Sequence, residues 1–255
     1  TLDKYQAGQM MGDIYGYETI GIAKSKDEMD QHLASLPNGG QNALGTNWDA
    51  GDIMYKDLNG DGKIDNGGNK YDDMGDMKKI GNNTPRYLFG LDLNADYKGF
   101  DFRAFFQGVM KRDYWQGSAY FWGATSLWHS TGFVEHADYF RAEASNDLPA
   151  NLNAYYPRPV FDSSKNRQKQ TAYLQSAAYI RLKNVQLGYT LPANLTHKFY
   201  VSKLRIFVSG ENLWTGTSLA NMFDPETIGG GDDTDKNGNA YPLSKTISFG
   251  ISVTL

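Results

Sequence analysis

The chain has 255 residues, of which 28 are glycine, 17 tyrosine and 13 phenylalanine, with no cysteine and a net charge of −4. This composition favours strands and turns, excludes disulfides and thiolate metal sites, and gives no support for nucleic acid as a partner. No apolar run of about 20 residues is present, which excludes a transmembrane helix, whereas a transmembrane β-strand needs only about 9 to 11 alternating residues.

The first predicted strand covers about residues 14–23, and the long connection after it carries the pattern of a calcium-binding loop. Asp57, Asn59 and Asp61 occupy the first, third and fifth positions, where their side-chain oxygens can converge on one hard cation. A glycine follows at the sharp turn, and Lys63 then offers its backbone carbonyl. The sequence therefore predicts a calcium site that stiffens a long exposed loop.

The final ligand of this loop departs from the usual pattern. Its twelfth position is Gly68 rather than a bidentate acid, so an acid from elsewhere must complete the site. The available acids are Asp65, Asp72, Asp73 and Asp76. The ligand pattern alone leaves open which of them does so.

The clearest strands form a hairpin between about residues 87 and 107, with Lys98-Gly99 at the turn. Apolar residues alternate with charged or amide residues along most of both strands. The apolar set consists of Leu91, Leu93, Ala95, Tyr97, Phe100, Phe102, Ala104 and Phe106. In a soluble sandwich the polar face would meet water, and in a transmembrane barrel it would face the lumen, so alternation alone does not separate the two.

Three more strands follow. One, at about 178–191, keeps Ile180 and Leu182 on one face and then changes phase, which predicts a bulge near Lys183-Asn184. The others, near 204–209 and 247–255, alternate apolar and polar residues in the same way. We therefore expect an all-β fold with about six antiparallel strands.

The connections between these strands alternate in length. Lys98-Gly99 and the segment 191–202 are short, whereas 24–85, 109–177 and 212–245 are long. Short turns at one end and long loops at the other are typical of outer-membrane barrels, whose long loops face outside the cell. Loops of this length are uncommon in compact soluble domains unless they carry function.

The second long connection contains a cluster of aromatic residues: Tyr114, Trp115, Tyr120, Phe121, Trp122 and Trp128. Their rings could stack on sugar rings of a substrate or pack on a partner. They could equally form the core of the loop itself or an interfacial girdle. No nucleophile motif, phosphate loop or zinc motif accompanies them, so we do not expect an enzyme.

Taken in order, several short motifs resemble the SusC/RagA-like TonB-dependent transporters of the Gram-negative outer membrane. They extend over nearly the whole chain: Gly51-Asp52-Ile53, Tyr55 to Gly62, Ile80-Gly81-Asn82, Pro85-Arg86, Tyr97 to Asp101, Phe106-Gln107-Gly108, Tyr179 to Val185, Leu187 to Pro192, Ser202 to Arg205, Ser209 to Leu213 and the last strand. Each motif is weak alone, and their order makes them specific.

The resemblance implies that residues 1–255 are the C-terminal part of a large, multi-pass transmembrane β-barrel in outer-membrane lipid, with a calcium-binding extracellular loop at about 51–82. It places the plug domain, the remaining strands and the link to the TonB complex in an N-terminal part that this chain does not contain. It implies import of glycans or peptides together with a SusD-like surface lipoprotein. It also identifies Asp76 as the displaced last ligand, so the expected calcium ligands are Asp57, Asn59, Asp61, Lys63, Asp65 and Asp76.

A second hypothesis comes from another class of protein. A secreted, calcium-stabilised β-sandwich that binds carbohydrate would also combine a calcium loop with exposed tryptophans. It does not explain loops that are long at one end only. The position of the apolar strand faces separates the two hypotheses, because a sandwich buries them between two sheets.

Overall fold

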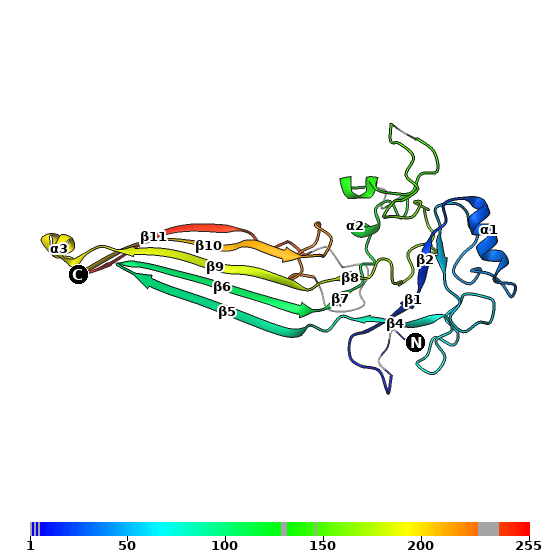
Figure 1. Ribbon diagram of the computed structural model, residues 1–255, viewed down its shortest axis with the longest axis horizontal. Helices are drawn as coiled ribbons and strands as arrows, with labels where there is room; N and C mark the ends of the chain where they lie inside the picture. Colours follow the sequence, from blue (N-terminus) through cyan, green and yellow to red (C-terminus); the bar gives the residue numbers. More distant parts are fainter. Residues whose placement is uncertain (1, 3, 5, 129–131, 146, 229–239) are drawn as a thin grey trace. The chain divides into compact units, whose positions relative to one another are not determined.

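The computed structural model describes residues 2, 4, 6–128, 132–145, 147–228 and 240–255 (Figure 1). The chain divides into two compact units. The loop unit consists of the described residues within 1–84 and 113–175, and the strand unit of residues 85–112, 176–228 and 240–255.

The strand unit is one antiparallel sheet with the strand order β11-β10-β9-β6-β5. Its strands are β5 (Arg86–Tyr97), β6 (Phe100–Lys111), β9 (Tyr179–Thr190), β10 (Lys203–Thr217) and β11 (Thr246–Thr254). Sheet neighbours are therefore also neighbours in the chain, apart from the short strands of the second long loop. In such a meander the two short connections lie at one end of the sheet, where α3 and the C-terminus are also found (Figure 1).

The register confirms the predicted sorting of side chains onto two faces. Phe102 pairs with Leu187, Leu187 with Val208, and Val208 with Phe249, so one apolar row crosses four strands. Phe102, Leu187 and Phe249 are exposed, with 84% of the Phe249 surface accessible, and Val208 is half-buried. The polar residues between them point to the opposite face, as period-2 alternation requires.

Charged side chains on that opposite face are paired across strands. Arg205 on β10 donates to both carboxylate oxygens of Asp101 on β6, and its Nη2 also lies 2.9 Å from Oε1 of Gln186. The Arg205 side chain reaches Asp101 over the intervening strand because Gly188 has no side chain there: a Cβ on Gly188 would lie 2.4 Å from Nη2 of Arg205. A second pair, Arg103 and Asp92, joins β5 and β6 at 2.7 Å.

The predicted bulge in the strand at 178–191 is confirmed. Phe105 pairs with Asn184 and Phe106 with Leu182, so β9 has one extra residue, Lys183, at this point. β10 is also irregular opposite this site, between Glu211 and Trp214. The extra residue changes the phase of β9 and keeps both of its halves apolar on one face.

The segment between β9 and β10 contains two short helical turns, α3 (Ala193–Thr196) and the 3-10 helix η2 (His197–Phe199). Pro192 precedes α3 with φ −59°, a value that suits the first turn of a helix. Tyr200 then adopts φ +59° and closes η2. The connection is short because these turns bring the chain directly back to the sheet.

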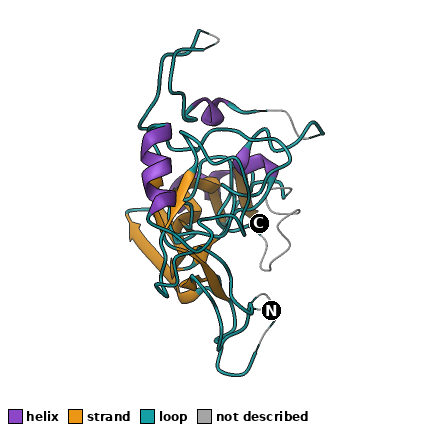
Figure 2. Cartoon of the chain, turned by 90° about the vertical axis from the view of Figure 1, so that its right-hand side faces the viewer, coloured by secondary structure: helices purple, strands orange, loops and turns teal. Residues whose placement is uncertain are grey.

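The loop unit contains short strands and little helix. Its elements are β1 (Asp13–Tyr17), β2 (Thr19–Ile22), α1 (Lys26–Ala34), β3 (Ile53–Tyr55), β4 (Met77–Asn82), β7 (Asp113–Tyr114), α2 (Ala119–Trp122), η1 (Val134–Ala137) and β8 (Gln175–Ser176), whose last residue belongs to the strand unit. Most of its backbone is neither helix nor strand (Figure 2). None of the helices among the described residues is long and apolar enough to cross a membrane.

The expected strand at 14–23 is the part of the fold prediction that was wrong. It is divided into β1, which pairs with β4, and β2, which pairs with β3, and neither belongs to the five-stranded sheet. Four of the five β1 residues are buried, unlike the half-exposed strands of the sheet. Gly16 packs against backbone: a Cβ there would lie 2.4 Å from the carbonyl oxygen of Lys169. β1 is therefore a core strand of the loop unit, whereas β2 is only partly buried.

Candidate functional site

The predicted calcium loop is folded around its own carboxylates. Asp57 accepts hydrogen bonds from the backbone N–H of Gly60 at 2.6 Å and of Gly62 at 2.8 Å. Both glycines have positive φ, +77° and +78°, a conformation in which glycine avoids the strain of a Cβ. Asn59 and Asp61 accept from the N–H groups two residues further on, at 3.0 and 3.1 Å. Short polar side chains and glycines thus fix the turn locally.

Asp76 lies in the same loop, although it comes 19 residues after Asp57 in the sequence. Its side chain is fully buried and accepts from the N–H of Leu58 at 2.8 Å and of Asp65 at 2.9 Å. Burial, with a further contribution from the charge of Asp57, raises the pKa of Asp76 against the opposing effect of these hydrogen bonds. A buried carboxylate near a second carboxylate is a position that a cation would stabilise.

Asp65 differs from Asp76 in having a cationic partner. Nζ of Lys63 lies 2.5 Å from one of its carboxylate oxygens, and the N–H of Gly67 donates to the other at 2.8 Å. Within the described ranges, no three His, Asp or Glu side chains converge as a metal-binding group. The oxygen donors of the loop still suit a hard cation, since amide and backbone carbonyl oxygens complement its carboxylates.

The aromatic cluster divides into buried and exposed members. Tyr114, Trp115, Phe121 and Trp122 are buried, whereas Tyr120 is 45% and Trp128 is 93% exposed. Phe121 packs edge-on against Trp122 at 5.1 Å and against Tyr156 at 5.4 Å between ring centroids. Four of the six residues therefore contribute to the aromatic core of the loop unit, one of the alternatives that the sequence left open. Direct contact with a substrate or partner stays a prediction for Tyr120 and Trp128.

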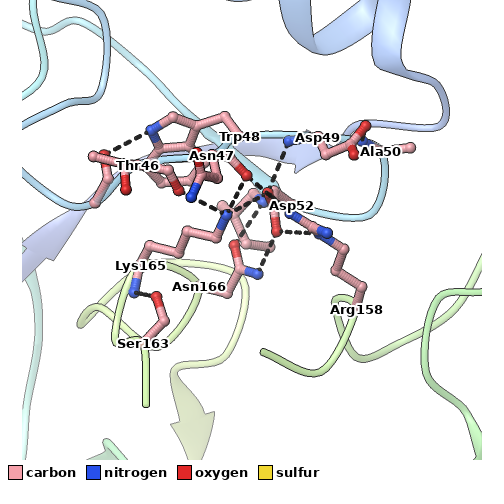
Figure 3. Close-up of polar contacts among 12 residues, drawn as sticks. Thr46, Asn47, Trp48, Asp49, Ala50, Asp52, Arg158, Ser163, Lys165 and Asn166 are labelled. Carbon is pink, nitrogen blue, oxygen red and sulfur yellow. Dashed lines mark hydrogen bonds and ion pairs between the residues drawn. The ribbon is translucent and has the colours of Figure 1, made fainter. Parts of the chain in front are cut away.

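A charged cluster that the sequence did not indicate joins the first long loop to the second. Asp52 is fully buried, and Arg158 donates to its two oxygens at 2.8 and 2.7 Å (Figure 3). Lys165 donates at 2.7 Å, and Asn166 donates at 2.8 Å while accepting from the N–H of Ile53. We call Asp52, Arg158, Lys165 and Asn166 the Asp52 cluster.

In the Asp52 cluster, the buried carboxylate of Asp52 is balanced by the cationic and amide groups that donate to it. Burial alone would raise the pKa of Asp52, but the hydrogen bonds from Arg158, Lys165 and Asn166 outweigh it and lower the pKa. Lys165, only 2% exposed, also donates to the carbonyls of Thr46 and Asn47 and lies 4.9 Å from the ring centre of Trp48. Each buried charge thus has partners, which is the condition under which buried ion pairs are tolerated.

The comparisons with known proteins cover nearly the whole chain. No family model matches it. It is 28% identical over 253 residues to a TonB-dependent receptor of Formosa agariphila, covering 96% of the chain and 22% of that receptor. A second TonB-dependent receptor of the same organism is 26% identical over 260 residues, covering 97% of the chain and 23% of the relative.

Solved structures of the RagAB system match the fold. The chain aligns to the RagAB peptide transporter with a TM-score of 0.59 and 21% identity, covering 94% of this chain and 22% of that one. The RagAB peptide importer in its closed-closed state gives a TM-score of 0.57 at 19% identity, covering 98% of this chain and 25% of that one. The chain is thus similar in sequence to TonB-dependent receptors and similar in fold to part of the RagAB transporter.

The chain spans about a fifth to a quarter of the length of these receptors and solved chains. Several motifs of the SusC/RagA-like resemblance have structural roles in it. Gly51-Asp52-Ile53 supplies the buried acid of the Asp52 cluster, and Gly51 adopts φ +84°. In Ile80-Gly81-Asn82, the Asn82 side chain donates to Asp13 at 2.7 Å, which ties β4 to β1.

Proposed function

We propose that the chain forms part of the wall and the external loops of an outer-membrane active transporter that imports a large nutrient. The observation that carries this proposal is the exposed apolar face of the five-stranded sheet. Leu91, Phe102 and Ile251, from three different strands, are 49%, 39% and 70% exposed. Such a face is stable against lipid, and large exposed apolar patches on soluble proteins are rare.

The sandwich alternative has less support. The strand unit contains a single sheet among its described residues, and its apolar side chains are not covered by a second one. Phe249 and Ile206, which a sandwich would bury, are 84% and 46% exposed. The antiparallel meander with short connections at one end is also the arrangement of a barrel wall.

For the whole receptor we propose energy coupling through TonB and capture of substrate with a SusD-like surface lipoprotein. The substrate would be a peptide or a glycan, and similarity to the RagAB peptide transporter and importer favours a peptide. The relatives are receptors and transporters rather than enzymes, in keeping with a non-enzymatic role.

Substrate uptake tests this function. Cells that depend on the complete receptor should take up labelled oligopeptides, and this uptake should stop when the receptor gene is deleted or the proton gradient is collapsed. A set of oligosaccharides offered in parallel decides between the two substrate classes. Uptake of both classes that is unchanged in the deletion strain would contradict the transport proposal.

We also propose that the loop from Asp57 to Asp76 binds calcium. Asp57, Asn59 and Asp61 would supply side-chain oxygens, Lys63 its carbonyl, and Asp76 the last carboxylate, with Asp65 nearby. The bound cation would supply the positive charge that the buried Asp76 lacks. Its role would be structural, since it would order an exposed loop.

Replacement of Asp57 and Asp61 by Ala should abolish calcium binding and speed backbone hydrogen exchange between residues 57 and 76, because the loop loses its cross-link. Exchange in β5 to β11 should not change, since loop order and sheet hydrogen bonds are separate sources of stability. Asp27→Ala on the exposed side of α1 is the matched control. Wild-type exchange that is equal with calcium and with chelator would contradict the calcium proposal.

A further inference from the structure

The loop unit contains a pocket of about 350 Å³ that belongs neither to the calcium loop nor to the sheet. Its walls are formed by aromatic side chains and by two guanidinium groups: Trp122, Phe133, Tyr139, Tyr156, Arg158 and Arg167. This volume is at the lower end of the range for small-molecule sites, and an aromatic lining with a few polar groups is their usual composition.

The aromatic wall is held in place by contacts of His136 with its neighbours. His136, which also lines it, accepts from the N–H of Phe133 at 2.9 Å through Nδ1 and contacts the carbonyl of Phe121 at 3.0 Å through Nε2. Its ring packs against Tyr156 at 5.4 Å and Phe133 at 5.6 Å. Both ring nitrogens are therefore engaged with backbone groups, and His136 serves as a fixed wall rather than as an acid or base.

The two arginines of the pocket differ in their charge balance. Arg158 is paired with Asp52, which raises its pKa. Arg167 forms no ion pair among the described residues, and its Nε and Nη2 both donate to the carbonyl of Ser163, at 3.1 and 2.9 Å. Burial lowers its pKa, with only a partial opposing effect from the charge of Asp162. Within the described part of the chain, Arg167 is thus a half-buried cation with no carboxylate in direct contact.

Acidic residues act on the pocket from nearby without an ion pair to Arg167: the charge of Asp162 acts on Arg167, and the charges of Glu135 and Asp138 act on Tyr156. Arg158, the second guanidinium of the pocket, shares the single carboxylate of Asp52 with Lys165. An anion would therefore be attracted here, and an arginine fork suits a carboxylate. The aromatic and proline residues around it favour an apolar body on the same ligand.

We propose that this pocket binds an organic carboxylate with a ring-sized apolar body, whose carboxylate pairs with Arg167 and whose ring packs against Trp122 and Tyr156. The binding site lies within the loop unit and is independent of whether the receptor transports the ligand. The simplest probe of this chemistry is phenylacetate. Its neutral isostere phenylacetamide tests the need for charge, and glucuronate tests whether a polar ring is accepted in place of the apolar one.

Binding of the three probes to the complete purified receptor should be measured by calorimetry or by ligand-observed NMR. Phenylacetate should bind with a dissociation constant of about 1 to 10 mM, as expected for so small a ligand. Phenylacetamide and glucuronate should each bind at least about tenfold more weakly, because one lacks the charge and the other the apolar ring.

Arg167→Gln should weaken phenylacetate binding by about tenfold or more and leave the weak binding of phenylacetamide unchanged, because only the carboxylate uses the cation. Lys26→Gln on α1 removes the same charge from an exposed site of the same unit and should have no effect. Val160→Trp, which fills the pocket and leaves Arg167 in place, should abolish binding of phenylacetate.

Thermal unfolding of each variant shows whether it has folded. The proposal is overturned if folded wild-type receptor does not bind phenylacetate at 50 mM, a concentration of roughly ten times the expected constant. It is also overturned if phenylacetamide or glucuronate binds as tightly, or if folded Arg167→Gln binds phenylacetate as the wild type does. None of these results depends on uptake, so failure of the transport assay and failure of this proposal are distinguishable.

Discussion

At the scale of single residues, the loop unit contains two buried carboxylates with opposite electrostatic surroundings. Asp52 and Asp76 are both fully buried carboxylates, and their environments differ. Asp52 has two cations and an amide around it, which lower its pKa, whereas Asp76 has backbone N–H donors and a neighbouring carboxylate, and its pKa is raised. The first residue is a structural cross-link, and the second is a carboxylate that a cation would stabilise.

Replacement of Asp52 by Asn should destabilise the loop unit by about 3 to 5 kcal/mol, because Lys165 and Arg158 would be left without their carboxylate. Hydrogen exchange of residues 46–53 and 158–166 in the complete receptor measures this. Asp27→Asn in the first turn of α1 is an exposed control. An exchange pattern in Asp52→Asn identical to that of the wild type would contradict a stabilising role.

The pH dependence of this stability follows from the lowered pKa of Asp52. A depressed carboxylate pKa contributes stability above the unfolded value of about 3.9, and the contribution is lost as pH falls through the folded value. The loop unit should therefore lose protection from exchange below about pH 4, and Asp52→Asn should remove part of that pH dependence.

The pKa of Asp76 is raised rather than lowered. Calcium binding should weaken as pH falls toward that pKa, because Asp76 takes up a proton and loses its charge.

At the scale of elements, glycines decide how closely neighbouring strands and their side chains approach. A Cβ on Gly108 in β6 would lie 2.2 Å from the backbone oxygen of Tyr179 in the next strand. A Cβ on Gly188 would meet only the ends of the Arg205 and Asp101 side chains, at 2.4 and 2.5 Å. Backbone cannot move without breaking sheet hydrogen bonds, whereas side-chain ends can swing away.

Gly108→Ala should therefore lower the thermal unfolding temperature of the receptor clearly more than Gly188→Ala does. Gly188→Ala should lower the free energy of unfolding by no more than about 1 kcal/mol, because the partly exposed ion pair of Arg205 and Asp101 contributes little to stability. Loss of the β-sheet circular dichroism signal on heating measures the unfolding temperature of both variants. Equal effects of the two substitutions would contradict the register described for β6 and β9.

How well the sequence predicts each element depends on how far apart in the chain the interacting residues are. Alternation with period 2 is local, so the long strands and the bulge at Lys183 could be read from the sequence. β1 and β2 could not be assigned to their true partners, because pairing with β4 and β3 depends on distant segments. The Asp52 cluster was missed for the same reason: Asp52 and Arg158 are 106 positions apart, and isolated charges in loops are usually solvated.

At the scale of the whole molecule, the sheet is open. Among the described residues, β5 and β11 each have only one neighbouring strand. Unpaired edges and exposed apolar faces promote aggregation in water, and backbone groups at an open edge would be unsatisfied in lipid. Under the proposed placement in lipid, the sheet would require further strands on both sides, and the relatives are four to five times as long as the chain.

Residues 1–255 expressed alone should therefore be insoluble or aggregated in water. Size-exclusion chromatography of the soluble fraction, and detergent extraction of the remainder, measure this. The complete receptor, expressed under the same conditions, is the control and should be recovered from the membrane fraction. A soluble monomer with a cooperative unfolding transition would contradict the assignment to a barrel wall.

The central claim, that the apolar face of the five-stranded sheet meets lipid, can be measured with introduced cysteines, because residues 1–255 contain none and any cysteine elsewhere in the receptor can be replaced first. Single cysteines introduced at Ile206, Phe249 and Ile251, and at Arg205 and Ser252 on the opposite face, can be labelled with a fluorophore. In receptor reconstituted into vesicles, lipids with brominated acyl chains should quench the label at the first three positions and not at the last two. Quenching at Arg205 and Ser252, or its absence at Phe249 and Ile206, would contradict the account.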